Sequence, residues 1–150
     1  MLLSDLKIEG GRAVVTHDSS KEEPPYTGDI EADTLDNNYF RKVLFTGKHS
    51  QLVVMSLRPG EDIGDEVHKG VDQFFRIESG QAKFILNETE EYIAAEGQAC
   101  VVPCGTFHNV INMSDADPLK LYTIYSPSNH PPGTIHETKA DAIAGEKEGE

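Results

Sequence analysis

Four side chains in the middle of the chain are of the types that bind divalent metal ions. They are Glu66, His68, Gln73 and His108. Imidazole nitrogens suit zinc, iron, nickel and copper, and a carboxylate neutralises part of the metal charge. Gln73 would add a neutral amide oxygen or hold a metal-bound water. Together they predict a site for a divalent ion (zinc, iron, manganese or nickel, with the choice left open) that keeps positions free for water or substrate.

Strand alternation gives these four side chains a way to meet. Residues two apart in an extended strand point to the same side, so Glu66 and His68 share a face. Gln73 lies on one face of the next β-rich run, and His108 follows a turn at 103–105. If the strands close into a barrel with these faces inward, the four side chains converge in its interior.

Neighbouring reactive side chains are expected to have other roles. Asp72 is an alternative ligand, but pleat alternation points it away from the face of Gln73. Arg76 shares the face of Asp72 and is expected to join a structural ion pair. Cys100 lies in an apolar run as a small hydrophobic residue, and Cys104 is expected to be a turn residue, with sulfur ligation as the alternative. Both are expected to be reduced thiols.

Short β-rich runs separated by Gly or Pro occupy the middle of the chain, with no sustained helical period. The expected strands are residues 40–45, 51–57, 73–78, 81–86, 91–94, 99–102, 109–111 and 119–125. The run 81–86 follows Ser79-Gly80 and is expected to pair with 73–78 as a hairpin. Several short strands at a spacing of roughly 8–12 residues indicate an all-β sandwich or barrel, and closure would remove exposed strand edges.

The two ends differ in composition from this central part. Residues 17–37 are rich in Asp and Glu and have few large apolar side chains, which predicts an extended arm or partly mobile loop. Residues 137–150 are rich in Ala, Gly, Lys and Glu, and they predict a short helix around 139–144 followed by a solvated tail. The expected division is an N-terminal arm over 1–37, a barrel over 38–128 and a C-terminal extension over 129–150.

Length and charge restrict the class of protein. The 150 residues suffice for one domain with a core, and the formal net charge of −13 leaves no basic stripe for nucleic acid or anionic membranes. No run approaches the roughly 18 consecutive apolar residues of a transmembrane helix, and the first residues lack the pattern of a secretory signal. We expect a cytoplasmic protein that acts on a small molecule and binds neither nucleic acid nor membranes.

The spacing of these residues resembles the two sequence motifs of the cupin superfamily, Gly-x5-His-x-His-x4-Glu-x6-Gly and Gly-x5-Pro-x-Gly-x2-His-x3-Asn. The second motif matches at every fixed position, namely Gly97, Pro103, Gly105, His108 and Asn112. The first matches at Gly60, His68 and Gly80. It departs at two ligand positions, where Glu66 replaces a histidine and Gln73 replaces the glutamate. The resemblance implies a cupin double-stranded β-helix, a jelly-roll barrel that forms a homodimer.

A longer string resembles a smaller group within that superfamily. Residues 66–76 read Glu-x-His-x3-Asp-Gln-Phe-x-Arg and, with the segments 122–127 and 130–132, are similar to small bacterial cupins described as mannose-6-phosphate isomerase-like. Phosphomannose isomerases also mix Gln, His and Glu around zinc, which is compatible with a Gln ligand.

Three functions stand as hypotheses. The first is a metal-dependent enzyme that isomerises a small polar metabolite such as a sugar, with Lys83, His130 and Tyr122 as candidate bases. The sequence shows no basic cluster for a phosphate group, which counts against a phosphorylated sugar. The second is an Fe(II) dioxygenase, and the third is a non-catalytic ligand-binding or sensing module. His130 and His136 would line a pocket mouth or pack against a partner subunit.

Overall fold

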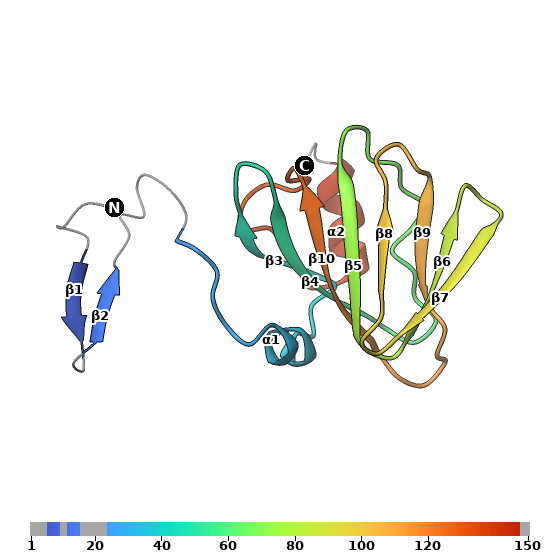
Figure 1. Cartoon of the computed structure of the whole chain (residues 1–150). Helices are drawn as coiled ribbons and strands as arrows, with labels where there is room; N and C mark the ends of the chain where they lie inside the picture. Colours follow the sequence, from blue (N-terminus) through green and yellow to red (C-terminus); the bar gives the residue numbers. More distant parts are fainter. Residues whose placement is uncertain (1–5, 10–11, 16–23, 148–150) are drawn as a thin grey trace.

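The computed structural model describes residues 6–9, 12–15 and 24–147, and most of its regular structure is β-strand. The larger sheet contains β3 (Arg41–Thr46), β4 (Gln51–Leu57), β5 (Asp72–Ser79), β8 (Ala99–Val102), β10 (Leu119–Ser126) and β11 (Ile135–His136). The smaller sheet contains β6 (Gln81–Leu86), β7 (Glu90–Ala95) and β9 (His108–Asn112). Their orders are β11-β3-β4-β10-β5-β8 and β7-β6-β9, with antiparallel pairing throughout (Figure 1).

The apolar faces of the two sheets share one core. Phe75 of β5 and Phe84 of β6 are buried, and their rings meet edge to face with centroids 5.2 Å apart. Met55 and Ile77 from the larger sheet and Val110 from the smaller one belong to the same buried cluster. Burial of this apolar surface drives the sheets together. The predicted all-β fold is confirmed.

The predicted strands are also confirmed, and their bounds differ from the observed ones by at most one residue at an end. Along β5, the inner face carries Gln73 and Phe75, whereas Asp72 is exposed and Phe74 is only partly buried. The alternation on which the site prediction depended therefore holds in this strand.

The predicted hairpin between residues 73–78 and 81–86 is wrong. Strand β5 pairs with β10 and β8, whereas β6 pairs with β7 and β9. Because Ser79 continues β5, only Gly80 separates the two strands, which is fewer than the two residues of the shortest common hairpin loop. Gly80 has φ +96°, and a Cβ there would lie 3.2 Å from the Pro118 carbonyl oxygen. The chain passes from one sheet to the other at this glycine.

The N-terminal part holds regular structure that composition did not predict. Strands β1 (Leu6–Glu9) and β2 (Arg12–Val15) pair with each other, and α1 (Ile30–Asp36) lies against β4, β5 and β10. The Asp29 side chain caps α1 by accepting a hydrogen bond from the Ala32 N–H at 3.0 Å. Residues 17–23 of the predicted arm lie outside the described residues.

At the C-terminal end, the predicted short helix is confirmed as α2 (Lys139–Lys147). Before it, β11 pairs with β3, so the predicted C-terminal extension contributes a strand to the larger sheet. The predicted tail beyond residue 147 lies outside the described residues.

Candidate metal centre

The segment between β4 and β5 carries two of the predicted ligands and is joined to β9 by its backbone. Glu66 and His108 exchange both backbone hydrogen bonds, N–H to carbonyl, at 2.8 Å each. The Gly105 N–H donates to the His68 carbonyl at 2.8 Å, from the turn that precedes β9. These backbone contacts hold the two motif segments side by side, so that residues 42 positions apart in the chain become neighbours.

Three of the four predicted ligands form a tight cluster. One ligand atom from each of Glu66, His68 and His108 lies within 4.8 Å of the other two. The Glu66 Oε2 atom is 3.1 Å from His68 Nε2 and 3.9 Å from His108 Nε2. Since a carboxylate only accepts, the shorter contact is a hydrogen bond donated by His68. A metal ion would take the place of that proton.

His108 is held in the tautomer that a metal ligand needs. Its Nδ1 donates to the Thr106 carbonyl at 2.9 Å, which leaves the lone pair on Nε2. The residue is 2% exposed, and Nε2 has no hydrogen-bond partner among the described residues. Buried nitrogens without a partner are costly, so this atom calls for a bound group in the cluster. The donor set therefore fits a divalent ion.

Gln73, the fourth predicted ligand, is buried in β5 beside Tyr125 of β10, its partner in the strand register. Its Nε2 donates to Thr123 Oγ1 at 3.0 Å, and its Oε1 has no partner among the described residues. The free oxygen is the one that would bind a metal or a metal-bound water. Its membership of the site stays a prediction.

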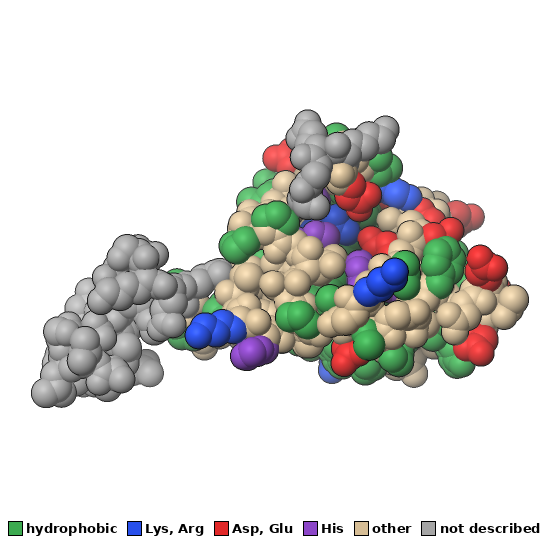
Figure 2. Space-filling view, turned by 90° about the horizontal axis from the view of Figure 1, so that it is seen from above, with side chains coloured by type: hydrophobic (Ala, Val, Ile, Leu, Met, Phe, Trp, Pro, Cys, Tyr) green, Lys and Arg blue, Asp and Glu red, His purple; other side chains and the backbone are tan. Residues whose placement is uncertain are grey.

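A cavity of about 250 Å³ opens onto the cluster. It is lined by Glu66, Val67, His68, Asn129, His130 and Glu146. Histidine and acidic side chains gather on this face of the molecule (Figure 2). The loop after β10 is fixed by buried Gln51, whose Oε1 accepts from the Asn129 and His130 N–H groups at 3.1 and 2.9 Å. The Gln51 side chain thereby holds His130 at the cavity wall.

Of the three candidate bases, only His130 lines this cavity. Lys83 is on the outer side of β6 and lies 4.0 Å from Glu91. Tyr122 is on the outer side of β10, where its ring lies 6.1 Å from that of Phe74. Neither side chain is placed to move a proton at the cluster.

His130 is neutral at neutral pH. Burial lowers its pKa to about 3, and the positive charges of Arg41, His136 and His68 act in the same direction. Its Nε2 lies 3.3 Å from the Tyr125 hydroxyl, and burial raises the pKa of that hydroxyl above its usual value. His130 is thus a hydrogen-bonding group at the cavity wall and a weak base.

The residues expected to lie outside the site do so. Asp72 accepts a hydrogen bond from the Cys104 N–H at 2.9 Å, which fixes the turn before β9. Arg76 pairs with Glu78 at 3.2 Å, as predicted. Cys100 and Cys104 are free thiols, the first partly buried and the second exposed. Burial raises the pKa of the Cys100 thiol.

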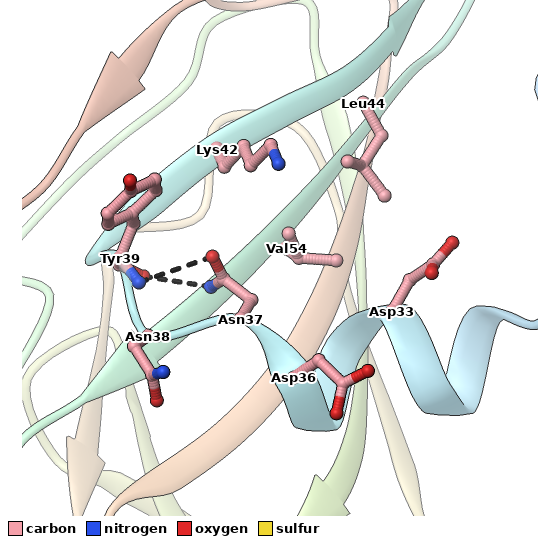
Figure 3. A pocket seen from close by; sticks show the side chains of 8 residues that line it. All are labelled: Asp33, Asp36, Asn37, Asn38, Tyr39, Lys42, Leu44 and Val54. Carbon is pink, nitrogen blue, oxygen red and sulfur yellow. Dashed lines mark hydrogen bonds between the residues drawn. The ribbon is translucent and has the colours of Figure 1, made fainter.

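A larger cavity, of about 530 Å³, lies between α1 and the outer side of β3 and β4 (Figure 3). The Asn37 side chain makes two hydrogen bonds there with the backbone of Tyr39, at 2.9 and 3.2 Å. The residues that line it include no histidine or cysteine. It lacks the nitrogen and sulfur donors of a transition-metal site, so we place the candidate function at the smaller cavity.

One buried group was missed by the sequence analysis. Arg41, on the inner face of β3, is 1% exposed and contacts His136 of β11. Alternation with Val43 indicates an inward face for Arg41, but the pattern does not reveal its contact with His136.

The comparisons with known proteins agree with this architecture. Residues 53–125 match the family described as Cupin domain. The chain is 50% identical over 127 residues to the uncharacterized protein YrkC of Bacillus subtilis (strain 168), a match covering 81% of this chain and 68% of that protein. It is 47% identical over 118 residues to the uncharacterized protein L612 of Acanthamoeba polyphaga mimivirus, covering 77% and 74% respectively.

Among solved structures, BH2720 from Bacillus halodurans is similar with a TM-score of 0.78 and 44% identity, covering 81% of this chain and 95% of that one. Within the described residues, no helix is both long and apolar enough to cross a membrane. The family match, the two facing antiparallel sheets and the two motif segments joined at Glu66 and His108 lead to one conclusion. The chain belongs to the cupin superfamily.

Proposed function

We propose that this cupin binds a divalent metal ion through Glu66, His68 and His108, with Gln73 as a further ligand or as the holder of a metal-bound water. The observation that carries the proposal is the buried Nε2 of His108, which has no partner among the described residues. It belongs to the same cluster as the side chains of Glu66 and His68. Two imidazoles and a carboxylate suit zinc, iron, manganese and nickel.

The reaction that we propose is the isomerisation of a small polar metabolite such as a sugar, as in the mannose-6-phosphate isomerase-like group. A metal held by these ligands would act as a Lewis acid toward an oxygen of the substrate. The chain's own groups bind and orient it. His130 offers a neutral ring nitrogen at the cavity wall. Asn129 and Glu146 offer further polar groups along the cavity lining.

A specific observation also supports each of two other functions, an Fe(II) dioxygenase and a non-catalytic binding module. Two histidines and one carboxylate within 4.8 Å are the ligand set of Fe(II) dioxygenases, which would show oxygen consumption that depends on iron. A non-catalytic binding module is favoured by the weak basicity of His130, the one candidate base of the three that lines the cavity. That module would hold a ligand tightly without turnover.

The test is the metal content of untagged protein purified without chelator, measured by inductively coupled plasma mass spectrometry. We expect near-stoichiometric metal in the wild type and its loss in the His68→Ala/His108→Ala double variant. His49→Ala is the matched control, because it removes an exposed histidine outside the cavity. Full metal content in the double variant would refute the site. Iron as the bound metal would favour the dioxygenase, whereas zinc, manganese or nickel would favour the isomerase.

We also propose a homodimer and a cytoplasmic location. The homodimer is supported by exposed apolar side chains on the edge strands β7 and β8. Among them are Tyr92, Ile93 and Val101, whose side chains are 51%, 49% and 61% exposed. Sedimentation equilibrium of the full chain tests the dimer, since a monomer mass at micromolar concentration would contradict it.

A further inference from the structure

The C-terminal helix α2 is fixed to the body of the protein at its first turn. The Thr138 hydroxyl accepts a hydrogen bond from the Asp141 N–H at 3.1 Å, and the Asp141 carboxylate accepts one from the Thr138 N–H at 3.3 Å, a reciprocal pair that caps the helix. Lys139 forms an ion pair with Asp62, whose second carboxylate oxygen accepts a hydrogen bond from Asn109 Nδ2 at 2.8 Å. The start of α2 is therefore tied to β9, the strand that carries one of the candidate ligands.

One face of this helix turns toward the protein. Ala142 is 3% exposed and belongs to the hydrophobic core. Residues four positions apart in an α-helix lie on the same face, so Glu146 is on the face that buries Ala142. Ile143, in contrast, is 44% exposed and lies on the solvent side. Glu146 accordingly lines the candidate metal cavity, together with Glu66 and His68.

The Glu146 carboxylate is available to a ligand. Within the part of the chain that the structure describes, it forms no hydrogen bond and no ion pair. It does not belong to the cluster that could hold a metal ion. The residue is exposed, so a molecule that enters the cavity from solution can reach it. A carboxylate with no contact in the fold is free to contact the molecule in the cavity.

The charges that line the cavity indicate the charge of that molecule. The described residues of the lining include two carboxylates, Glu66 and Glu146, and no Lys or Arg. His130 is neutral, as its lowered pKa of about 3 requires. The two positive charges of a divalent ion would be balanced by the two carboxylates. A neutral ligand keeps this balance, whereas a phosphate or carboxylate group would add a negative charge that no cation of this lining offsets.

The hydrogen-bonding groups of the lining point to the same class of molecule. An ionised carboxylate only accepts hydrogen bonds, so Glu146 needs donors on the ligand, and the Asn129 amide can both donate and accept. Hydroxyl groups supply such donors and acceptors without carrying charge. The cavity of about 250 Å³ is smaller than the roughly 300–1,000 Å³ of sites for drug-sized ligands, so the molecule is small.

We propose that the cavity takes a neutral polyhydroxy compound, such as a sugar without a phosphate or carboxylate group. Glu146 sets this specificity, because its carboxylate accepts hydrogen bonds from hydroxyl groups and repels anions. The inference rests on the proposed function, since it names the substrate class of the same metal site. It assigns the choice of ligand to α2, which lies outside the residues 53–125 that match the Cupin domain.

The experiment compares sugars of different charge by isothermal titration calorimetry on metal-loaded protein freed of excess metal. The probes are glucose, glucose 6-phosphate and glucosamine, with mannose and mannose 6-phosphate as a second pair. We expect the wild type to bind at least one neutral sugar about fivefold or more tightly than its phosphate, the upper range for one exposed charge contact. Glu146→Gln should lose most of this preference and Glu146→Lys should reverse it. Added salt should weaken the preference in the wild type.

The matched control is Glu90→Gln, which removes the same charge from an exposed position of β7 outside the cavity. It should keep the preference. Four results would overturn the inference: phosphates bound as tightly as the neutral sugars, no measurable binding of either neutral sugar, tighter binding of glucosamine than of glucose, or an unchanged preference in Glu146→Lys. Because Glu146 is exposed, its variants should keep the wild-type unfolding midpoint. If a variant does not fold, the wild-type comparison alone decides.

The failure of the metal site can be told apart from the failure of this inference. Both Glu146 variants should keep the metal content of the wild type, since Glu146 lies outside the ligand cluster. If the wild type binds no metal, the preference for neutral sugars should still appear in the His68→Ala/His108→Ala variant with EDTA, because the carboxylates of Glu66 and Glu146 then face the ligand alone. Equal affinity for sugar and phosphate in metal-loaded wild type refutes the role of Glu146 and leaves the metal site standing.

Discussion

Replacing Asn112 with Ala removes the side chain at the end of β9 that contacts three backbone carbonyls, one from the end of β4 and two from loops. Asn112 is 2% exposed, and its Nδ2 lies 3.2, 3.1 and 2.9 Å from the carbonyl oxygens of Leu57, Arg58 and Asp117. Its Oδ1 accepts from the Ser114 N–H at 3.0 Å. The last position of the second cupin motif is therefore a structural clamp outside the metal cluster.

The magnitude follows from the number of bonds. Nδ2 has two hydrogens, so no more than two of the three carbonyl contacts are full hydrogen bonds at once, and Oδ1 makes one more. Each bond contributes about 1 kcal/mol, and a buried group left without a partner costs about 1–3 kcal/mol. Some of the carbonyls are only partly buried, and water can satisfy these. We expect Asn112→Ala to lower the free energy of unfolding by about 2–4 kcal/mol.

The assay is urea unfolding followed by tyrosine fluorescence, because the chain has no tryptophan. Thr89→Ala, in the exposed turn between β6 and β7, is the control and should change the free energy by less than about 0.5 kcal/mol. Asn112→Asp keeps the side-chain volume but sets an acceptor against the carbonyls, so it should cost at least as much as Ala. A loss below about 1 kcal/mol for Ala, or near-wild-type stability for Asp, would refute the hydrogen-bond argument.

Two further predictions concern other elements of the fold. Gly80→Ala should lower the free energy of unfolding, measured by urea titration, by at least about 1 kcal/mol more than Gly97→Ala does. Both glycines have positive φ, but only a Cβ at position 80 would meet the backbone of another segment. Equal losses of free energy in the two variants would contradict this. Cys104 should react with a thiol reagent such as DTNB in the folded protein well before Cys100, which is partly buried and has a raised pKa. Equal rates, measured against Cys104→Ser, would show that burial does not protect Cys100.

The sequence predicted those features that depend on local periodicity. Alternation in β5 correctly separated Gln73 from Asp72. Motif spacing correctly brought Glu66 and His108 together, because turns of fixed length leave the backbone few ways to connect. For α1, the capping signal of Asp29 was present in the sequence, but the acidic composition around it indicated an arm.

Features that depend on distant neighbours could not be predicted in this way. Alternation indicates which face of β3 carries Arg41, yet its contact is His136, 95 residues further along the chain. The predicted pairing of β5 with β6 was wrong for a similar reason. Gly80 packs against the Pro118 carbonyl, which comes from a distant segment of the chain. Lys83 and Tyr122 were plausible bases by residue type, and the sheets turn both outward.

The backbone pairing between Glu66 and His108 separates the positions of the two residues from the choice of their metal-binding side chains. Both hydrogen bonds join main-chain atoms, so neither bond uses a side-chain atom of these two residues. A carboxylate can therefore occupy the place that the cupin motif gives to an imidazole without any change in strand register. The reverse exchange, Glu66→His, would enter the same scaffold and raise the number of neutral donors. The scaffold thus allows the charge of the ligand set, and with it the preference among metals and ligands, to vary by single substitutions.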